Sequence, residues 1–258
     1  MPYVLGLDSG TQSLRAVIAD LSGGIVASAT RAYPIDFPHV SWAEQNAEDW
    51  WAAARQIVPE ALAAAGLTGD DIAGISVDGT ACTVIACKRD STPLRPVILW
   101  MDQRAHDQAC RVTTTKDPIL KYVGWQESPE WMIPKALWLR ENEPAVYEQA
   151  DLIIEGVDWL MYRLTGNWAA SLNNVTAKWN YAAPAGGWPD SLLDALSFSE
   201  IRDKWPTTVL PMGERAGELT RTAAEELGLK PGIPVAEGGI DAYCGMLGLG
   251  VVRPNRMA

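Results

Sequence analysis

Apolar and polar residues alternate in three short runs at the start of the chain. The runs cover residues 3–8, 14–20 and 24–35, and glycine-bearing turns separate them. Alternation with a period of two between turn residues is typical of β-strands, and short turns join neighbouring strands in antiparallel order. The first three strands are therefore predicted to form an antiparallel meander.

The pattern then changes to the three- and four-residue spacing of an amphipathic helix. Residues 46–66 begin at Asn46, which can cap a helix, carry acids in the first turn and end at Gly66. Residues 72–79 (IAGISVDG) form a short apolar run with polar residues at its end, which predicts a buried strand. Residues 82–102 are predicted to form a hairpin that turns between 88 and 92.

Helical spacing dominates from about residue 104 to 165. It predicts helices at 104–112, 134–150 and 157–166, whereas residues 171–190 are rich in turn residues and are expected to be loop or strand. A helix at 220–229, a strand at 233–239 and a glycine-rich helix start at 241–250 follow. Strands followed by alternating helices and strands indicate an α/β domain with a mixed sheet.

Composition narrows the classes of function. The 258 residues are 48% apolar, enough for a substantial core, and the net charge of −11 argues against nucleic acid or an anionic membrane as a partner. Four cysteines without CxxC spacing and two histidines give little support to a zinc site or a histidine-based triad. No apolar run approaches about 18 residues and no basic segment precedes the first one, so a cytoplasmic protein is predicted.

The first turn carries more polar chemistry than a hairpin requires. Glycine lets the backbone approach a phosphate closely, neighbouring N–H groups and hydroxyls can donate to it, and an arginine can bind it with two parallel hydrogen bonds. The candidate phosphate ligands are Gly10, Thr11, Gln12, Ser13 and Arg15. Asp8, at the end of the first strand, could hold a magnesium ion directly or through its waters. The alternative is an ordinary hairpin turn whose polar residues bind no ligand.

A second candidate is Asp241, which follows Gly238 and Gly239 at the start of the last predicted helix. A helix N-terminus stabilises a carboxylate, which is then available to accept a proton. The alternative is that Asp241 only caps the helix.

Two strand ends and one lone cation are candidates for binding a substrate. Ligands of open α/β sheets bind at strand ends, and an indole ring can cover the apolar face of a sugar. The candidates are Asp78, Thr80, Trp100, Asp102 and Lys178. The alternatives are a core tryptophan, a surface ion pair for Asp102 with Arg104, and a solvated lysine.

Together these segments resemble the N-terminal domain of the FGGY family of carbohydrate kinases. The matching segments are GLDSGTQSLRAVIAD, WAEQNAEDWW, WMDQRA and GGIDA. The resemblance implies a ribonuclease H-like, actin-like ATPase domain with helices on both faces of the sheet and a helical insertion at about 104–165. It also implies ATP and Mg²⁺ as cofactors, nucleotide and metal contacts at the first hairpin, with the metal on Asp8, and Asp241 as the catalytic base and a sugar contact.

Details of the resemblance favour a pentulose. Gly79 and Thr80 stand where xylulose kinases carry a methionine–histidine pair and glycerol kinases an arginine–glutamate pair. VDGTAC, SPEWMIPKALWL and AKWNY look closer to the ribulose-kinase-like branch, in which the lysine matching Lys178 reaches the sugar. D-Ribulose is the first choice, with D-xylulose, L-ribulose or another polyol as alternatives.

The family also has a C-terminal nucleotide-binding domain, which is expected to be absent from residues 1–258. The chain alone is therefore expected to be inactive, and the full-length enzyme is expected to be a homodimer. Two readings from other classes stay open: an ATPase of the actin or chaperone type, and a sugar-binding module without catalysis.

Overall fold

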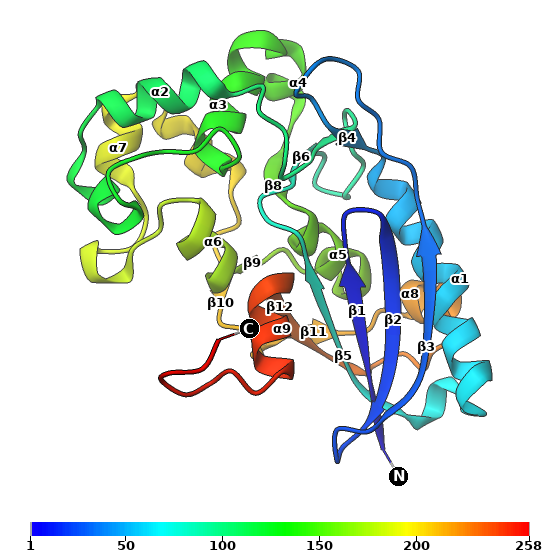
Figure 1. Ribbon diagram of the computed structural model, residues 1–258. Coiled ribbons are helices and arrows are strands. Elements are labelled where there is room, and N and C mark those ends of the chain that lie inside the picture. The colour runs from blue at the N-terminus through cyan, green and yellow to red at the C-terminus, as the bar shows by residue number, and fades with distance from the viewer. Residues whose placement is uncertain (1, 258) are drawn as a thin grey trace.

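A six-stranded mixed sheet forms the centre of the computed structural model, which describes residues 2–257 (Figure 1). Its strand order is β11-β12-β5-β1-β2-β3. The bounds are β1 Tyr3–Ser9, β2 Ser13–Asp20, β3 Ile25–Ala32, β5 Ile72–Gly79, β11 Arg215–Glu218 and β12 Pro234–Ile240. β1, β2 and β3 pair in antiparallel order, so the predicted meander is confirmed, while β5 and β12 run parallel to β1.

Helices cover both faces of this sheet, as predicted. Alternation turns Leu5, Leu7 and Leu14 to one face, where the residues are buried against three helices. These are α1 Ala47–Ala65, α5 Gly156–Thr165 and α8 Arg221–Leu227. The opposite face carries α9, Asp241–Gly248, which contacts β12 and β5 and stands in front of the sheet in Figure 1.

The predicted helix at 46–66 is confirmed with both of its ends. The Asn46 side chain accepts a hydrogen bond from the backbone N–H of Glu48 at 3.2 Å, and Gly66 adopts the left-handed conformation that closes the helix.

A second, smaller sheet separates two hydrophobic cores. Its order is β4-β7-β6-β8, with bounds β4 Glu44–Gln45, β6 Val84–Cys87, β7 Val97–Ile98 and β8 Leu152–Glu155. Because side chains alternate along a strand, Ile85 and Ile154 belong to the core under the large sheet, whereas Val84 and Ile153 belong to the second core. Both faces of this sheet are therefore buried.

The second core lies among shorter helices, at the upper left of Figure 1. They are α2 His106–Thr114, α3 Met132–Asn142, α4 Pro144–Gln149, α6 Leu172–Lys178 and α7 Asp190–Ala195. Short 3₁₀ helices occur at Gly69–Asp71, Pro118–Val123, Ala183–Ala185 and Ser199–Lys204, and β9 (Ala170–Ser171) pairs in parallel with β10 (Val209–Leu210). The helices expected between 104 and 165 thus divide, with α5 on the large sheet and the others in the second core.

Three sequence predictions need correction. The segment 171–190, expected to be loop or strand, contains α6, because its Asn174 and Trp179 are buried and bonded inside the protein and hide the usual amphipathic pattern. The single helix expected at 134–150 is two helices, because Glu143 leaves the helical region before Pro144 (φ −130, ψ 56). Strand β8, buried on both faces, was not predicted within the helical region.

The hairpin at 82–102 forms with less pairing than expected. The turn is closed by a 2.9 Å hydrogen bond from the Lys88 N–H to the Thr92 carbonyl, but β6 and β7 pair only between Val84 and Ile98.

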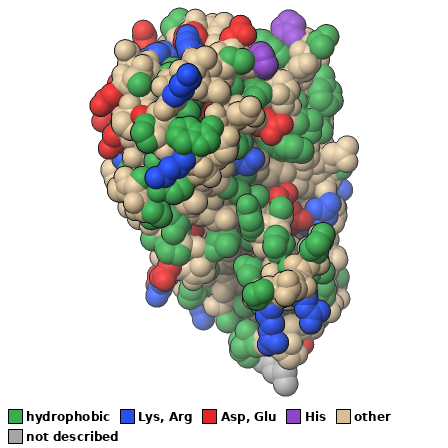
Figure 2. Space-filling model, turned by 60° about the vertical axis from the view of Figure 1, so that its left-hand side comes forward, with side chains coloured by type: hydrophobic (Ala, Val, Ile, Leu, Met, Phe, Trp, Pro, Cys, Tyr) green, Lys and Arg blue, Asp and Glu red, His purple; other side chains and the backbone are tan. Residues whose placement is uncertain are grey.

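The described residues contain no helix that is both long and apolar enough to cross a membrane. On the face drawn in Figure 2, basic and acidic side chains are scattered among hydrophobic and uncharged ones rather than gathered into one basic surface.

Candidate functional site

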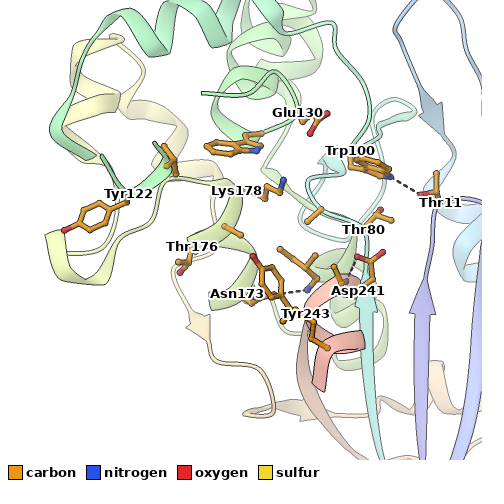
Figure 3. A pocket seen from close by; sticks show the side chains of 17 residues that line it. Thr11, Thr80, Trp100, Tyr122, Glu130, Asn173, Thr176, Lys178, Asp241 and Tyr243 are labelled. Carbon is orange, nitrogen blue, oxygen red and sulfur yellow. Dashed lines mark hydrogen bonds between the residues drawn. The ribbon is translucent and has the colours of Figure 1, made fainter. Parts of the chain in front are cut away.

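An open cavity of about 1050 Å³ lies between the large sheet and the helical second core. Its wall combines the first hairpin, the end of β5, the segment after β7, the loop before α3, α6 and the start of α9. Figure 3 shows Trp100 and Thr11 at one side and Lys178 across from them. The polar and aromatic residues that matter most here are Thr11, Thr80, Trp100, Glu130, Lys178 and Asp241.

The β1–β2 hairpin is held rigid at its tip. The Gly10 N–H donates to the Ser13 carbonyl at 3.1 Å, and the Tyr33 hydroxyl donates to the Gly10 carbonyl at 2.5 Å. Arg15 pairs with Asp8 at 2.6 Å, since the two residues lie opposite each other in the β1–β2 register. A side chain at Gly10 would place its Cβ 3.3 Å from Arg15 Nη1, so glycine fits this close approach best.

Only one of the predicted phosphate ligands with a side chain at the hairpin tip lines the cavity. Thr11 lines the cavity, and its hydroxyl accepts a 2.9 Å hydrogen bond from Trp100 Nε1. Gln12 is exposed and Ser13 is buried in β2, and neither lines the cavity. The hairpin therefore reaches the cavity through Thr11, while Asp8 and Arg15 lie beside it.

Three carboxylates meet at the carboxyl ends of the central strands. Asp8 and Asp78 are register partners on parallel β1 and β5. Burial, followed by the charges of Asp8 and Asp241, raises the pKa of Asp78 to about 7. Asp78 lies with Asp8 and Cys244 on the α9 side of the sheet and does not line the large cavity. Asp78 is therefore a neighbour of Asp8 and Asp241 and does not belong to the cavity wall.

Asp241 lies at the start of α9 and lines the large cavity. Burial raises the pKa of its carboxyl group, the 2.7 Å hydrogen bond from the Ala242 N–H opposes that rise, and the charge of Asp8 adds to it. A half-buried carboxylate of this kind is suited to accept a proton.

An aromatic and charged wall faces Asp241. Trp100 is fixed by its bond to Thr11, and the Lys178 ammonium lies 5.6 Å from the ring centre of Trp131. Glu130 accepts a 2.9 Å hydrogen bond from Gln103 Nε2. The wall thus offers a hydrogen-bond donor, an acceptor and apolar ring surface, which are the groups that recognise a sugar.

Asp102 is not brought to the cavity. Its carboxylate is fully buried, pairs with Arg104 at 2.7 Å and accepts the Ala43 N–H at 2.6 Å. It holds two loops together inside the protein.

Sequence reasoning missed several residues of the wall. Glu130 and Trp131 fall in SPEWMIPKALWL, which served only as a point of resemblance, and Tyr243 follows Asp241 on α9. Asn173 links α6 to the neighbour of Asp241, since its Oδ1 accepts the Ile240 N–H at 3.0 Å. An asparagine in a polar segment gives no local signal of such a role.

The carboxylates fit a magnesium ion that is shared with a substrate. In the described residues, no group of three or more His, Cys, Asp or Glu side chains is arranged as a metal cage. Magnesium commonly takes only one or two carboxylates and completes its shell with waters and phosphate oxygens. Asp8 at the end of β1 offers one such carboxylate, whose Oδ2 pairs with Arg15 at 2.6 Å.

Comparisons with known proteins identify relatives of the whole chain. The sequence model described as "FGGY family of carbohydrate kinases, N-terminal domain" matches residues 3–248. The chain is 36% identical over 265 residues to the human FGGY carbohydrate kinase domain-containing protein, covering 97% of this chain and 47% of that protein. It is 32% identical over 290 residues to the ribulokinase of Anoxybacillus flavithermus, covering 99% of this chain and 50% of that protein.

A solved structure extends the similarity to the fold. The xylulose kinase of Rhodospirillum rubrum superposes with a TM-score of 0.85 at 27% identity, over 98% of this chain and 51% of that one. The chain spans about half the length of the curated relatives it matches.

Proposed function

Since the chain belongs to the FGGY family of carbohydrate kinases, we propose that it supplies the sugar-binding half of an enzyme that transfers the γ-phosphate of ATP to a hydroxyl group of a pentulose. One observation carries the proposal: a single cavity joins Thr11 of the phosphate hairpin, Asp241 and Lys178. The similarity to a ribulokinase and a xylulose kinase supports a pentulose substrate.

Asp241 acts as the general base in this proposal. It lines the cavity at the start of α9, where it can accept the proton of the sugar hydroxyl as that oxygen attacks phosphorus. The raised pKa brings its proton affinity closer to that needed at neutral pH.

The first hairpin holds the phosphate end. Phosphoryl transfer depends mostly on positioning and neutralisation of charge, which backbone N–H groups near Gly10, the Thr11 hydroxyl and the Arg15 guanidinium can supply. Asp8 would hold a magnesium ion, directly or through its waters, and such an ion would neutralise phosphate charge.

The opposite wall holds the sugar. Trp100 presents ring surface, the Lys178 ammonium donates to hydroxyl oxygens and Glu130 accepts from hydroxyl groups. Thr80, directly after β5, lines the cavity and adds a hydroxyl group to its lining. We place D-ribulose first, ahead of D-xylulose, L-ribulose and other polyols.

The test is direct binding of sugars to this chain. Ligand-observed NMR with D-ribulose, D-xylulose, L-ribulose and glycerol, each in competition with the others, ranks the four ligands. We expect D-ribulose to be the preferred ligand and Lys178→Met to weaken it. A chain that binds none of the pentuloses would contradict the sugar-binding proposal, and a preference for another pentulose would replace D-ribulose.

A further inference from the structure

A carboxylate outside the cavity accepts hydrogen bonds from the helix that carries Lys178 and from the residue that follows this helix. Glu155 ends β8 and is fully buried in the interior. Its Oε1 accepts a 2.5 Å hydrogen bond from Trp179 Nε1, and its Oε2 accepts a 3.0 Å hydrogen bond from Asn174 Nδ2. Both donors belong to α6 or to the residue that follows it.

The alternation of β8 explains this placement. Ile153 faces the second core, so Glu155, two residues later, faces the same way and reaches α6. A carboxylate has only acceptor sites, and two indole or amide N–H donors satisfy one site on each oxygen.

The start of α6 is tied down separately. The Ser171 N–H donates to Asp158 Oδ1 at 3.2 Å, and the Ser171 hydroxyl donates to the Gly238 carbonyl at 2.8 Å. The Ile240 N–H donates to Asn173 Oδ1 at 3.0 Å. The first of these bonds joins the start of α6 to α5, and the other two join it to β12 close to Asp241. Glu155 holds the middle and the end of the helix.

A helix of seven residues needs such contacts. Isolated helices this short are not stable in water, so the orientation of α6 depends on what holds it from inside the protein. Asn173, Thr176, Ala177 and Lys178 of this helix line the cavity. Lys178 follows Asn174 by about one helical turn, so the two residues are neighbours on the helix surface.

We propose that Glu155 is a positioning residue for sugar binding, because its bonds to Asn174 and Trp179 set the orientation from which Lys178 reaches the cavity. The inference rests on the proposed function for the role of Lys178. It assigns to Glu155 no contact with the substrate.

Two variants remove the bonds with little change of shape. Glu155→Gln replaces one acceptor oxygen by an amide nitrogen that donates, so the Asn174 Nδ2 donor loses its acceptor unless the Asn174 amide turns over to present its Oδ1, which has no partner among the described residues. Trp179→Phe removes the indole N–H that donates to the same carboxylate. The matched control is Trp159→Phe, because Trp159 is equally buried and its indole N–H donates to the Ser91 carbonyl at 2.8 Å, away from α6.

Amide hydrogen exchange measures how well the backbone of α6 is protected from solvent, and it needs no sugar. Relative to the amides of β1 and β2, those at the end of α6 should exchange at least about tenfold faster in Glu155→Gln and Trp179→Phe, since each variant alters a hydrogen bond between Glu155 and the end of the helix. Trp159→Phe should leave that ratio unchanged. Equal protection of α6 in all three variants would overturn the proposal.

Measurements of sugar binding then show whether Glu155 acts by positioning Lys178 or only by stabilising the folded protein. Glu155→Gln should weaken D-ribulose binding about tenfold in the otherwise unchanged chain and have no further effect in a Lys178→Met background. The same loss in both backgrounds would show that Glu155 does not act through Lys178. If Lys178→Met itself leaves sugar binding unchanged, the proposed role of Lys178 fails, and Glu155 then positions only the helix, as the exchange ratio reports.

Discussion

Glu127 should make the stability of the protein depend on pH. Its side chain is 9% exposed, and burial raises the pKa of its carboxyl group to about 8, against which the hydrogen bond from Asn180 works. Asn180 Nδ2 donates to Glu127 Oε2 at 2.9 Å, but Glu127 Oε1 and Asn180 Oδ1 have no hydrogen-bond partner among residues 2–257. A protonated carboxyl group can fill this gap by donating its O–H to Asn180 Oδ1.

The sign follows from the raised pKa. An acid that holds its proton more tightly when folded stabilises the native state fully below its ordinary pKa of 4.5 and loses that contribution as the pH rises through about 8. At about 1.4 kcal/mol for each pKa unit, the difference corresponds to at most about 5 kcal/mol. Water entry and small rearrangements around an ionised group reduce such penalties, so we expect about 2–3 kcal/mol.

Glu127→Gln tests this directly. A glutamine amide can accept from Asn180 Nδ2 and donate to Asn180 Oδ1, and it does not ionise. Urea unfolding at pH 5.5 and pH 8.5 should show that the native protein loses about 1–2 kcal/mol more than Glu127→Gln over this range, because about 1.4 kcal/mol of the total is already lost between pH 4.5 and 5.5. The matched control is Glu225→Gln on the exposed side of α8, which should follow the native protein. The reasoning is refuted if Glu127→Gln and the native protein show the same pH dependence.

Three further predictions concern the proposed activity. In a complete kinase that contains this chain, Asp241→Asn should lower the turnover rate by a factor on the order of 100 or more in a coupled ADP-release assay, and near-normal turnover would reduce Asp241 to a helix cap. In the same assay, Lys178→Met should raise the KM for the sugar with little effect on the KM for the nucleotide. Arg15→Ala should raise the KM for the nucleotide with little effect on that for the sugar. If Lys178→Met changes only the stability of the protein, Lys178 is not part of the sugar site. Residues 1–258 alone should show no measurable phosphorylation of D-ribulose with ATP and magnesium while still binding a pentulose weakly, and robust sugar-dependent ADP release would disprove this.

Short-range sequence patterns were enough to predict those elements whose contacts are made between residues close together in the sequence. The meander of β1 to β3 and the capped helix α1 were predicted because alternation, turns, Asn46 and Gly66 act within a few residues. The sequence also located Asp8, Thr11, Trp100, Lys178 and Asp241 at strand and helix ends. It could not show that Thr11 bonds Trp100, 89 positions away, because only folding brings those segments together.

The tertiary structure decided how the polar residues were divided between the cavity and the interior. Asp102 and Glu155 belong to a residue type that is normally exposed, yet both are fully buried because partners distant in the sequence satisfy them. For the same reason α6 was expected to be loop or strand, since its buried Asn174 looks like a turn residue. A hydrophobic pattern records which residues avoid water, but a buried polar residue is stable only with its partner, and that partner is fixed by the three-dimensional fold.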